Sequence, residues 1–110
     1  MSHRIAKINK LIKQQIAEII SRELDFKPGV FVTISKVDTT PDFRYTRIFV
    51  SIFPEKESDY ALKTLAKETY HLQGFLNKKL SIKPLPRLEF YLDTTEVKAA
   101  EVEKILKDLN

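Results

Sequence analysis

Isoleucine recurs at three- and four-residue steps near the start of the chain, and this spacing predicts an amphipathic helix. The side chains in this pattern are Ile5, Ile8, Ile12, Ile16, Ile19 and Ile20. They fall on one stripe of a helix that we expect to begin at a Ser2 cap and to end near Leu24. A helix with a single apolar stripe needs another element to cover that stripe. The chain is therefore expected to fold in layers around a shared core.

Two stretches that alternate apolar and polar residues follow the Pro28-Gly29 break, and each predicts a strand. The first covers residues 30–37 and the second covers residues 44–53. Between them, Thr39-Thr40-Pro41-Asp42 has the composition of a turn, with Asp42 as its cap. Because this connection is short, the strands should pair as an antiparallel hairpin. The second strand should turn two rows of side chains to opposite faces: Thr46, Ile48, Val50 and Ile52 on one, Tyr45, Arg47, Phe49 and Ser51 on the other.

A second helical pattern begins at Ser58 or Asp59. Its apolar positions continue to Leu80, and they fit either one bent helix or two shorter helices. Gly74 lies within this stretch and lowers helix propensity there by about 1 kcal/mol. The helix is therefore expected to be weakest at that position.

The remaining elements complete an α+β fold. Prolines keep residues 82–86 extended, because each restricts the residue before it. Residues 88–92 alternate as a third strand, and residues 93–110 carry the apolar side of a C-terminal helix. With one apolar face per element, we expect helices packed on one face of a three-stranded sheet.

Composition excludes most kinds of catalytic site. The 110 residues include no cysteine and two glycines, which excludes thiol nucleophiles, cysteine-ligated metals and glycine-rich phosphate loops. The two histidines and the acidic residues show no spacing typical of a metal site or of general acid–base catalysis. No apolar run is long enough to cross a bilayer, and the N-terminus lacks the pattern of a secretory signal. We expect one cytoplasmic domain, residues 1–110, that is not an enzyme and needs no cofactor, metal, membrane or small-molecule substrate.

Positive charge is concentrated in the body of the chain. Residues 1–92 carry 16 Lys or Arg and 10 Asp or Glu, whereas residues 93–110 carry 3 and 5. This distribution favours a polyanionic partner such as RNA, although solubilising charge alone gives a similar pattern. The candidate RNA contacts are Arg4, Lys7, Lys10 and Lys13 in the first helix, Arg44 and Arg47 in the second strand, and Lys78, Lys79, Lys83 and Arg87.

Tyr45 and Phe49 share the second strand with Arg44 and Arg47. Aromatic and guanidinium groups on a strand can stack on unpaired bases. The same aromatic side chains could instead face the helices, and the sequence leaves both arrangements open.

Four blocks of sequence carry a family resemblance. They are Ser-Arg-Glu-Leu at residues 21–24, the hairpin at residues 32–50, Leu65 with Leu-Gln-Gly-Phe-Leu at residues 72–76, and Leu-Pro-Arg-Leu-Glu-Phe-Tyr-Leu-Asp at residues 85–93. In this order they resemble the bacterial ribosome-binding factor A family over essentially the whole chain. The hairpin and the last block are the specific ones. The hairpin is similar to the family's pattern of one strand, the motif Ser-x-Asp-Leu and a second strand. The last block is similar to the family's Val-Pro-Glu-Leu-x-Phe-x-x-Asp.

The resemblance implies a KH-like fold of type II, with the element order α-β-β-α-α-β. It also implies a ribosome assembly factor that binds the small (30S) ribosomal subunit and its rRNA, assists 16S rRNA processing and supports growth in the cold. We expect it to act as a monomer.

One motif departs from the family pattern. KH domains clamp nucleotides with a Gly-x-x-Gly loop, and the family resembled here has Ala-x-Gly between its two central helices. An ungapped register, which we prefer, puts Glu68-Thr69-Tyr70 at that motif, and a shifted register puts Leu72-Gln73-Gly74 there. The family's usual arginine after the motif is Gln73 in this chain. We therefore expect a kink region at Glu68, Thr69, Tyr70 and Gly74, and RNA binding that rests on the first helix and residues 78–87 instead of a glycine clamp.

Two other interpretations remain open from the sequence. The chain could be a protein–protein adaptor in which the hairpin or the terminal helix recognises a protein and the basic charge is incidental. It could also be a general binder of single-stranded RNA.

Overall fold

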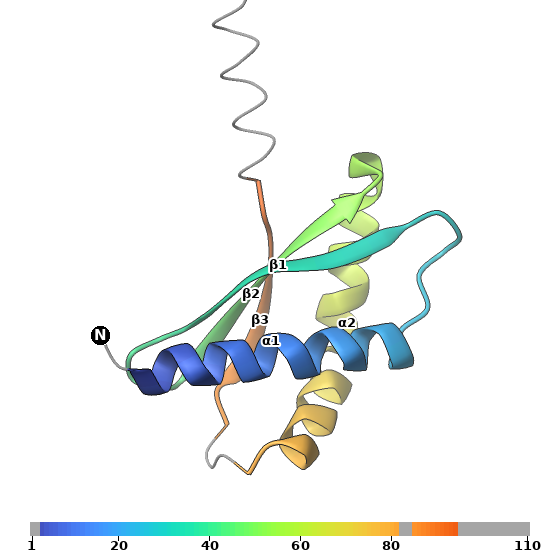
Figure 1. The fold of residues 1–110 in the computed structure, drawn as a ribbon. Coiled ribbons are helices and arrows are strands. Elements are labelled where there is room, and N and C mark those ends of the chain that lie inside the picture. Colours follow the sequence, from blue (N-terminus) through green and yellow to red (C-terminus); the bar gives the residue numbers. More distant parts are fainter. Residues whose placement is uncertain (1–2, 82–84, 95–110) are drawn as a thin grey trace, which may run out of the picture.

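Two helices and a three-stranded sheet make up most of the described chain (Figure 1). The computed structural model describes residues 3–81 and 85–94. In chain order the elements are α1 (His3–Glu23), β1 (Phe31–Thr39), β2 (Tyr45–Phe53), the 3-10 helix η1 (Glu55–Glu57), α2 (Ser58–Lys79) and β3 (Arg87–Leu92). The predicted α+β class is confirmed. The expected Ser2 cap, residues 82–84 and nearly all of the predicted C-terminal helix lie outside the described residues.

The central strand of the sheet is β2. It pairs antiparallel with β1 and parallel with β3, so the predicted hairpin is confirmed. Parallel strands cannot be joined by a tight turn, so α2 carries the chain back from the end of β2 to the start of β3. The C-terminal end of α2 therefore lies at the same end of the sheet as the turn between β1 and β2.

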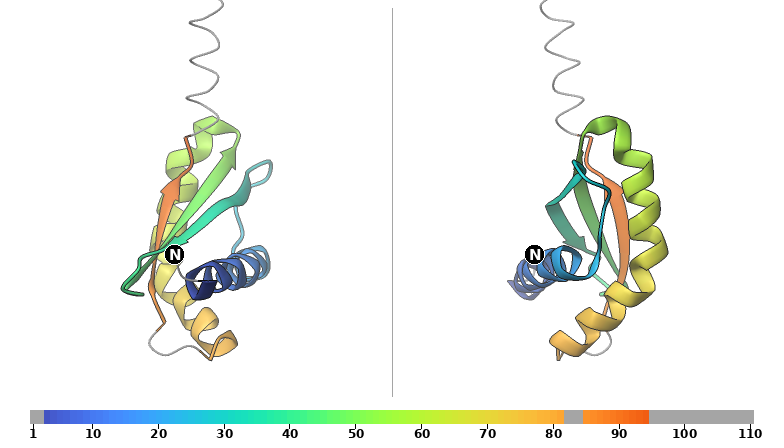
Figure 2. Two further views of the ribbon diagram at one scale, coloured as in Figure 1. Left: turned by 60° about the vertical axis from the view of Figure 1, so that its left-hand side comes forward. Right: turned by 90° about the vertical axis from the view of Figure 1, so that its right-hand side faces the viewer.

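Both helices contribute to one core that covers a single face of the sheet. In β2 the inward row is buried and the outward row is more exposed, as the alternation predicted. The helices meet this inward row with apolar side chains of one core cluster, and Figure 2 shows α2 running alongside β3. The buried side chains of the helices are Ile8, Ile12, Ile16, Ile19 and Ile20 in α1, and Ala61, Leu65, Leu72 and Leu76 in α2.

A bulge interrupts the pairing of β1 with β2 at Ser35. Ile34 pairs with Val50 and Lys36 pairs with Phe49, so Ser35 is the extra residue. The Ser35 hydroxyl donates a hydrogen bond to the Phe49 carbonyl oxygen at 3.2 Å. An extra residue reverses the alternation of side chains along a strand. The bulge therefore turns Val37 toward the core and places Lys36 on the outer face beside Phe49.

One continuous helix stands where the family resemblance implied two. The expected kink region of Glu68, Thr69, Tyr70 and Gly74 is helical throughout, and α2 curves along its length (Figure 2, right). Leu72 and Leu76 on its inner side are fully buried. Burial of a leucine side chain contributes about 1.5–3 kcal/mol, which exceeds the cost of about 1 kcal/mol for a glycine in a helix.

Replacement of Gly74 with alanine should stabilise the protein by about 0.5–1 kcal/mol. A Cβ atom at this position meets no atom within 4 Å, so the gain in helix propensity should not be offset by a clash. Urea denaturation of Gly74→Ala would check this, with an unchanged slope and a higher midpoint expected. A lower midpoint would mean that the curvature of α2 requires glycine.

The Thr39 and Thr46 hydroxyls form a buried pair between β1 and β2, with 2.9 Å between their oxygens. Thr46→Val should destabilise the protein by about 1–3 kcal/mol, because it leaves the Thr39 hydroxyl buried without this partner. The double variant T39V/T46V removes both hydroxyls and should be nearly as stable as the parent. Denaturation midpoints of the three proteins would measure this coupling. Equal losses that simply add in the double variant would contradict it.

Candidate nucleic-acid interface

The cations of α1 cover its solvent side. Arg4, Lys7, Lys10 and Lys13 are all exposed. Each of these residues is three positions after the one before, which is about 60° less than a full turn of the helix. The four side chains therefore spread around the solvent side, from one flank of the isoleucine stripe to the other. Lys13 lies nearest the sheet, where its Nζ donates to the Ser35 carbonyl oxygen at 3.5 Å.

Three arginines from distant parts of the sequence meet at the turn between β1 and β2. The Arg4 guanidinium lies over the Phe43 ring, 5.4 Å from its centroid. The Arg87 backbone N–H donates to the Arg44 carbonyl oxygen at 2.9 Å. Sequence reasoning had assigned Arg4, Arg44 and Arg87 to three separate groups. The fold unites them because the start of α1, the hairpin turn and the start of β3 adjoin one another.

The hairpin turn is held by its own side chains. Asp42 Oδ1 accepts hydrogen bonds from the Thr40 hydroxyl at 2.6 Å and from the Arg44 N–H at 3.0 Å. These bonds hold the pKa of Asp42 below its usual value. The turn lets Phe43 adopt a φ of 60°, a region that residues with a Cβ rarely occupy. The predicted capping role of Asp42 is confirmed, and its carboxylate lies 3.8 Å from Arg44 Nε.

Lys78 and Lys79 occupy the exposed last turn of α2, where cations also favour the helix dipole. Because α2 ends near the start of β3, these lysines lie toward the same end of the sheet as the three arginines. We call Arg4, Arg44, Lys78, Lys79 and Arg87 the basic end. The predicted contact Lys83 lies outside the described residues, and Arg47 lies away from the turn on the outer face of β2.

The region of α2 expected to form the kink lines a shallow hollow of about 330 Å³. The Tyr70 ring is 85% exposed at its rim. Glu68, in the same part of α2, has a carboxylate oxygen 3.1 Å from His71 Nδ1. The residues around the hollow are Tyr70, His71, Gln73, Gly74, Phe75, Asn77 and Lys78.

Gln73 has a role that sequence reasoning missed. Its side-chain oxygen accepts a hydrogen bond from the Leu88 N–H at 2.9 Å, and its Nε2 donates to the Pro86 carbonyl oxygen at 3.1 Å. These backbone groups lie at the start of β3, whose outer edge has no partner strand among residues 3–81 and 85–94. Gln73 thus satisfies two backbone groups at this open edge. The sequence offered one signal, an amide at a position where the resembled family has arginine.

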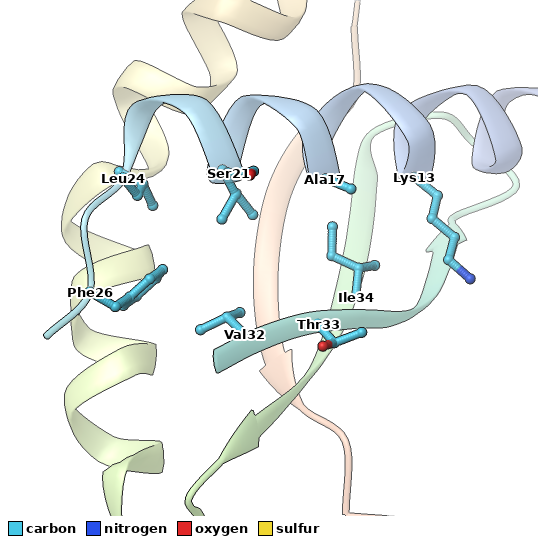
Figure 3. Close-up of a pocket in the computed structure, with 9 residues that line it drawn as sticks. Lys13, Ala17, Ser21, Leu24, Phe26, Val32, Thr33 and Ile34 are labelled. Atoms are coloured by element: carbon cyan, nitrogen blue, oxygen red, sulfur yellow. The ribbon is translucent and has the colours of Figure 1, made fainter. Parts of the chain in front are cut away.

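A groove of about 310 Å³ separates α1 from the opposite edge of the sheet. Figure 3 shows Val32 and Ile34 of β1 facing α1, with Phe26 at one end of the groove and Lys13 at the other. Its other lining residues are Ala17, Ile20, Ser21, Leu24 and Thr33. The groove is mainly apolar and was not foreseen from the sequence.

Residues 4–106 match the family model described as ribosome-binding factor A. The chain belongs to the ribosome-binding factor A family. Among individual relatives, ribosome-binding factor A of Bdellovibrio bacteriovorus is 34% identical over 107 residues, which cover 96% of this chain and 80% of the relative.

Solved structures of ribosome-binding factor A have the same fold. The crystal structure of the factor from Thermus thermophilus aligns with a TM-score of 0.70 and 28% identity, covering 80% of this chain and 93% of that one. A homology model of the Thermus thermophilus factor, fitted into a cryo-electron microscopy map of a 30S–factor complex, aligns with a TM-score of 0.66 and 28% identity. That alignment covers 86% of this chain and 96% of the fitted chain.

Two further kinds of site are a metal cluster and a membrane-spanning helix, and the described residues form neither. Between residues 3 and 81 and between 85 and 94, no three His, Asp or Glu side chains are grouped to hold a metal ion. Neither α1 nor α2 is long and apolar enough to span a bilayer.

Gln73→Ala should destabilise the protein by about 1–3 kcal/mol, because it leaves the Leu88 N–H and the Pro86 carbonyl without their partner. Gln73→Glu keeps the acceptor for the Leu88 N–H but sets a carboxylate oxygen against the Pro86 carbonyl oxygen, so it should also destabilise the protein. Thermal and urea denaturation would rank the two variants against the parent. If both were as stable as the parent, the amide would not be holding β3 to α2.

Proposed function

We propose that this chain is a ribosome assembly factor that binds the small (30S) ribosomal subunit. Membership of the ribosome-binding factor A family carries the proposal, supported by the related Thermus factor fitted into a map of a 30S complex. On this proposal the chain acts in the cytoplasm as a monomeric, non-enzymatic, KH-like domain formed by residues 1–110. It binds rRNA, assists 16S rRNA processing and supports growth in the cold.

The proposed RNA contact combines the basic end with the cations of α1. Arg4, Arg44, Lys78, Lys79 and Arg87 lie toward one end of the sheet on different elements, and Lys7, Lys10 and Lys13 extend the positive surface along α1. Lys83 belongs to the same set by its place in the sequence. Such a surface suits phosphate contacts, which supply affinity without reading the base sequence. A glycine clamp is unnecessary in this arrangement.

Co-sedimentation with purified 30S and 50S subunits at low and moderate salt tests the proposal. We expect salt-sensitive binding to 30S subunits only, because phosphate contacts are lost as counterions compete for them. Equal binding to both subunits, or none to either, would contradict it.

The triple variant Arg44→Gln, Lys78→Gln and Arg87→Gln tests the basic end itself. If each cation neutralises one phosphate, the log–log slope of affinity against salt should fall by about 2–3 units. A matched control neutralises three exposed lysines elsewhere, Lys56, Lys63 and Lys67, and should change the slope much less. The same slope for the two triple variants would show that the basic end is not the contact surface.

A protein–protein adaptor is the second candidate, and the apolar groove between α1 and β1 favours it. The outer edge of β1 beside this groove has no partner strand in the described ranges, and such an edge can accept an extended peptide. Adaptor binding should depend weakly on salt and should survive nuclease treatment of the partner. RNA-mediated binding should depend strongly on salt and should be lost after nuclease treatment.

A further inference from the structure

The outer face of the sheet carries an unusual number of aromatic side chains. They come from all three strands: Phe31, Tyr45, Phe49, Phe53 and Tyr91. Phe31 and Phe53, which pair across β1 and β2, are 64% and 68% exposed. No element among residues 3–81 and 85–94 covers this face, because both helices pack on the other one. Aromatic groups exposed together on a sheet are typical of a binding surface.

A hollow of about 190 Å³ lies on this face beside the Phe49 ring. The ring is stacked against Tyr91, with 5.7 Å between centroids and 30° between planes. Lys36 Nζ lies 5.9 Å from the centroid of Phe49. The remaining lining residues are Leu92, Asp93 and Thr94. The hollow thus combines an aromatic ring, stacked against Tyr91, with a lysine side chain that lies over that ring.

We propose that this hollow binds an unpaired RNA base stacked on Phe49, with Lys36 contacting the adjacent phosphate. The inference rests on the proposed function, in which the partner is RNA. The hollow is smaller than the 300–1,000 Å³ typical of sites for drug-sized ligands, which suits a single base. The carboxylate of Asp93 disfavours a phosphate inside the hollow, so the base occupies it and the phosphate lies toward Lys36.

The charged residues on this face argue against a protein partner that needs a continuous apolar patch. Between the aromatic positions of Tyr45 and Phe49, the register places Arg47 opposite Asp38 on β1 and Glu89 on β3. This charged row interrupts the aromatic surface, whereas the core of a protein–protein interface is depleted of charged residues. An aromatic ring with a cation beside it, as at Phe49 and Lys36, is the combination on which single-stranded nucleic acids stack and bind.

Fluorescence of an unstructured eight-nucleotide RNA containing 2-aminopurine tests the inference, because stacking quenches this base. We expect the full chain to quench the probe at low salt. Phe49→Leu, which preserves an apolar side chain, should weaken binding about tenfold, in line with the usual contribution of one stacked base. Phe53→Leu is the matched control, since it changes an exposed phenylalanine on the same strand and face but outside the hollow. It should bind as the parent does.

Lys36→Gln is a second variant that is independent of the packing of Phe49. It should lower the log–log salt slope by about 0.7, the value for one phosphate of a single strand. Circular dichroism melts would identify a variant that fails to fold, and the remaining variant then decides the question. Equal quenching by the parent, Phe49→Leu and Phe53→Leu, or an unchanged salt slope for folded Lys36→Gln, would overturn the proposal.

Comparison with subunit binding separates this inference from the proposed function. Normal 30S co-sedimentation with no quenching of the probe would overturn the base site and leave the assembly role standing. Quenching that depends on Phe49, without selective 30S binding, would support the base site and contradict the assembly role. If Phe49→Leu lost 30S binding and the parent never quenched the probe, the face would bind a ribosomal protein, and the RNA-base site would be wrong.

Discussion

The packing of α1 and α2 against the same side of β2 determines the rest of this structure. Ile12, Ile16, Leu65 and Leu76 are fully buried there, and each contributes about 1.5–3 kcal/mol by leaving water. Because β2 is the central strand and its side chains alternate strictly between the two faces, its inward row is buried in this core. The outward row then has nothing to cover it in the described chain. One-sided packing thus creates both the stability of the domain and its open, aromatic face.

Topology explains why the cations gather as they do. The parallel pairing of β2 with β3 forces α2 to return the chain to the end of the sheet where β2 begins. That return brings the lysines in the last turn of α2 and Arg87 at the start of β3 toward the hairpin turn. The backbone of Phe43 has a positive φ in the turn that Asp42 caps, and the guanidinium of Arg4 from α1 lies over the Phe43 ring. Local turn chemistry and long-range topology therefore cooperate in building the basic end.

The sequence predicted the elements well because their patterns are local. The isoleucine stripe, the hairpin and the two faces of β2 all follow from periodicities of 3.6 and 2 residues. The bulge at Ser35 could have been foreseen, because Ile34 and Val37 have opposite parity in an alternating strand and yet both are apolar. The apolar pattern of residues 58–80 left one bent helix or two short helices open, and the structure has one curved helix, in which the burial of Leu72 and Leu76 outweighs the weak propensity of Gly74.

Other features could not be predicted because they depend on contacts between distant residues. Nothing near Gln73 in the sequence indicates that its amide bonds to the backbone of residues 86 and 88. The meeting of Arg4, Arg44 and Arg87 likewise requires three elements to be placed in space. The choice left open for Phe49, toward the helices or away from them, was settled by the register, which stacks it on Tyr91 outside the core.

The two proposed contact surfaces would bind different parts of an RNA. As proposed, the basic end would bind any phosphate backbone, and the aromatic hollow would bind any base, because every base has a stacking face. Neither surface reads the edges of a base pair, so neither alone distinguishes one RNA from another. Arg47 lies on β2 between Tyr45 and Phe49, two residues from each. Strand β2 thus connects the basic end with the hollow and sets the distance between these two surfaces. On both proposals, selectivity for a particular RNA would come from shape, because its phosphates would have to lie at that distance from an unpaired base. A sheet packed on one side suits this kind of recognition, because the core that stabilises the sheet also holds the basic end and the hollow at a constant distance from each other.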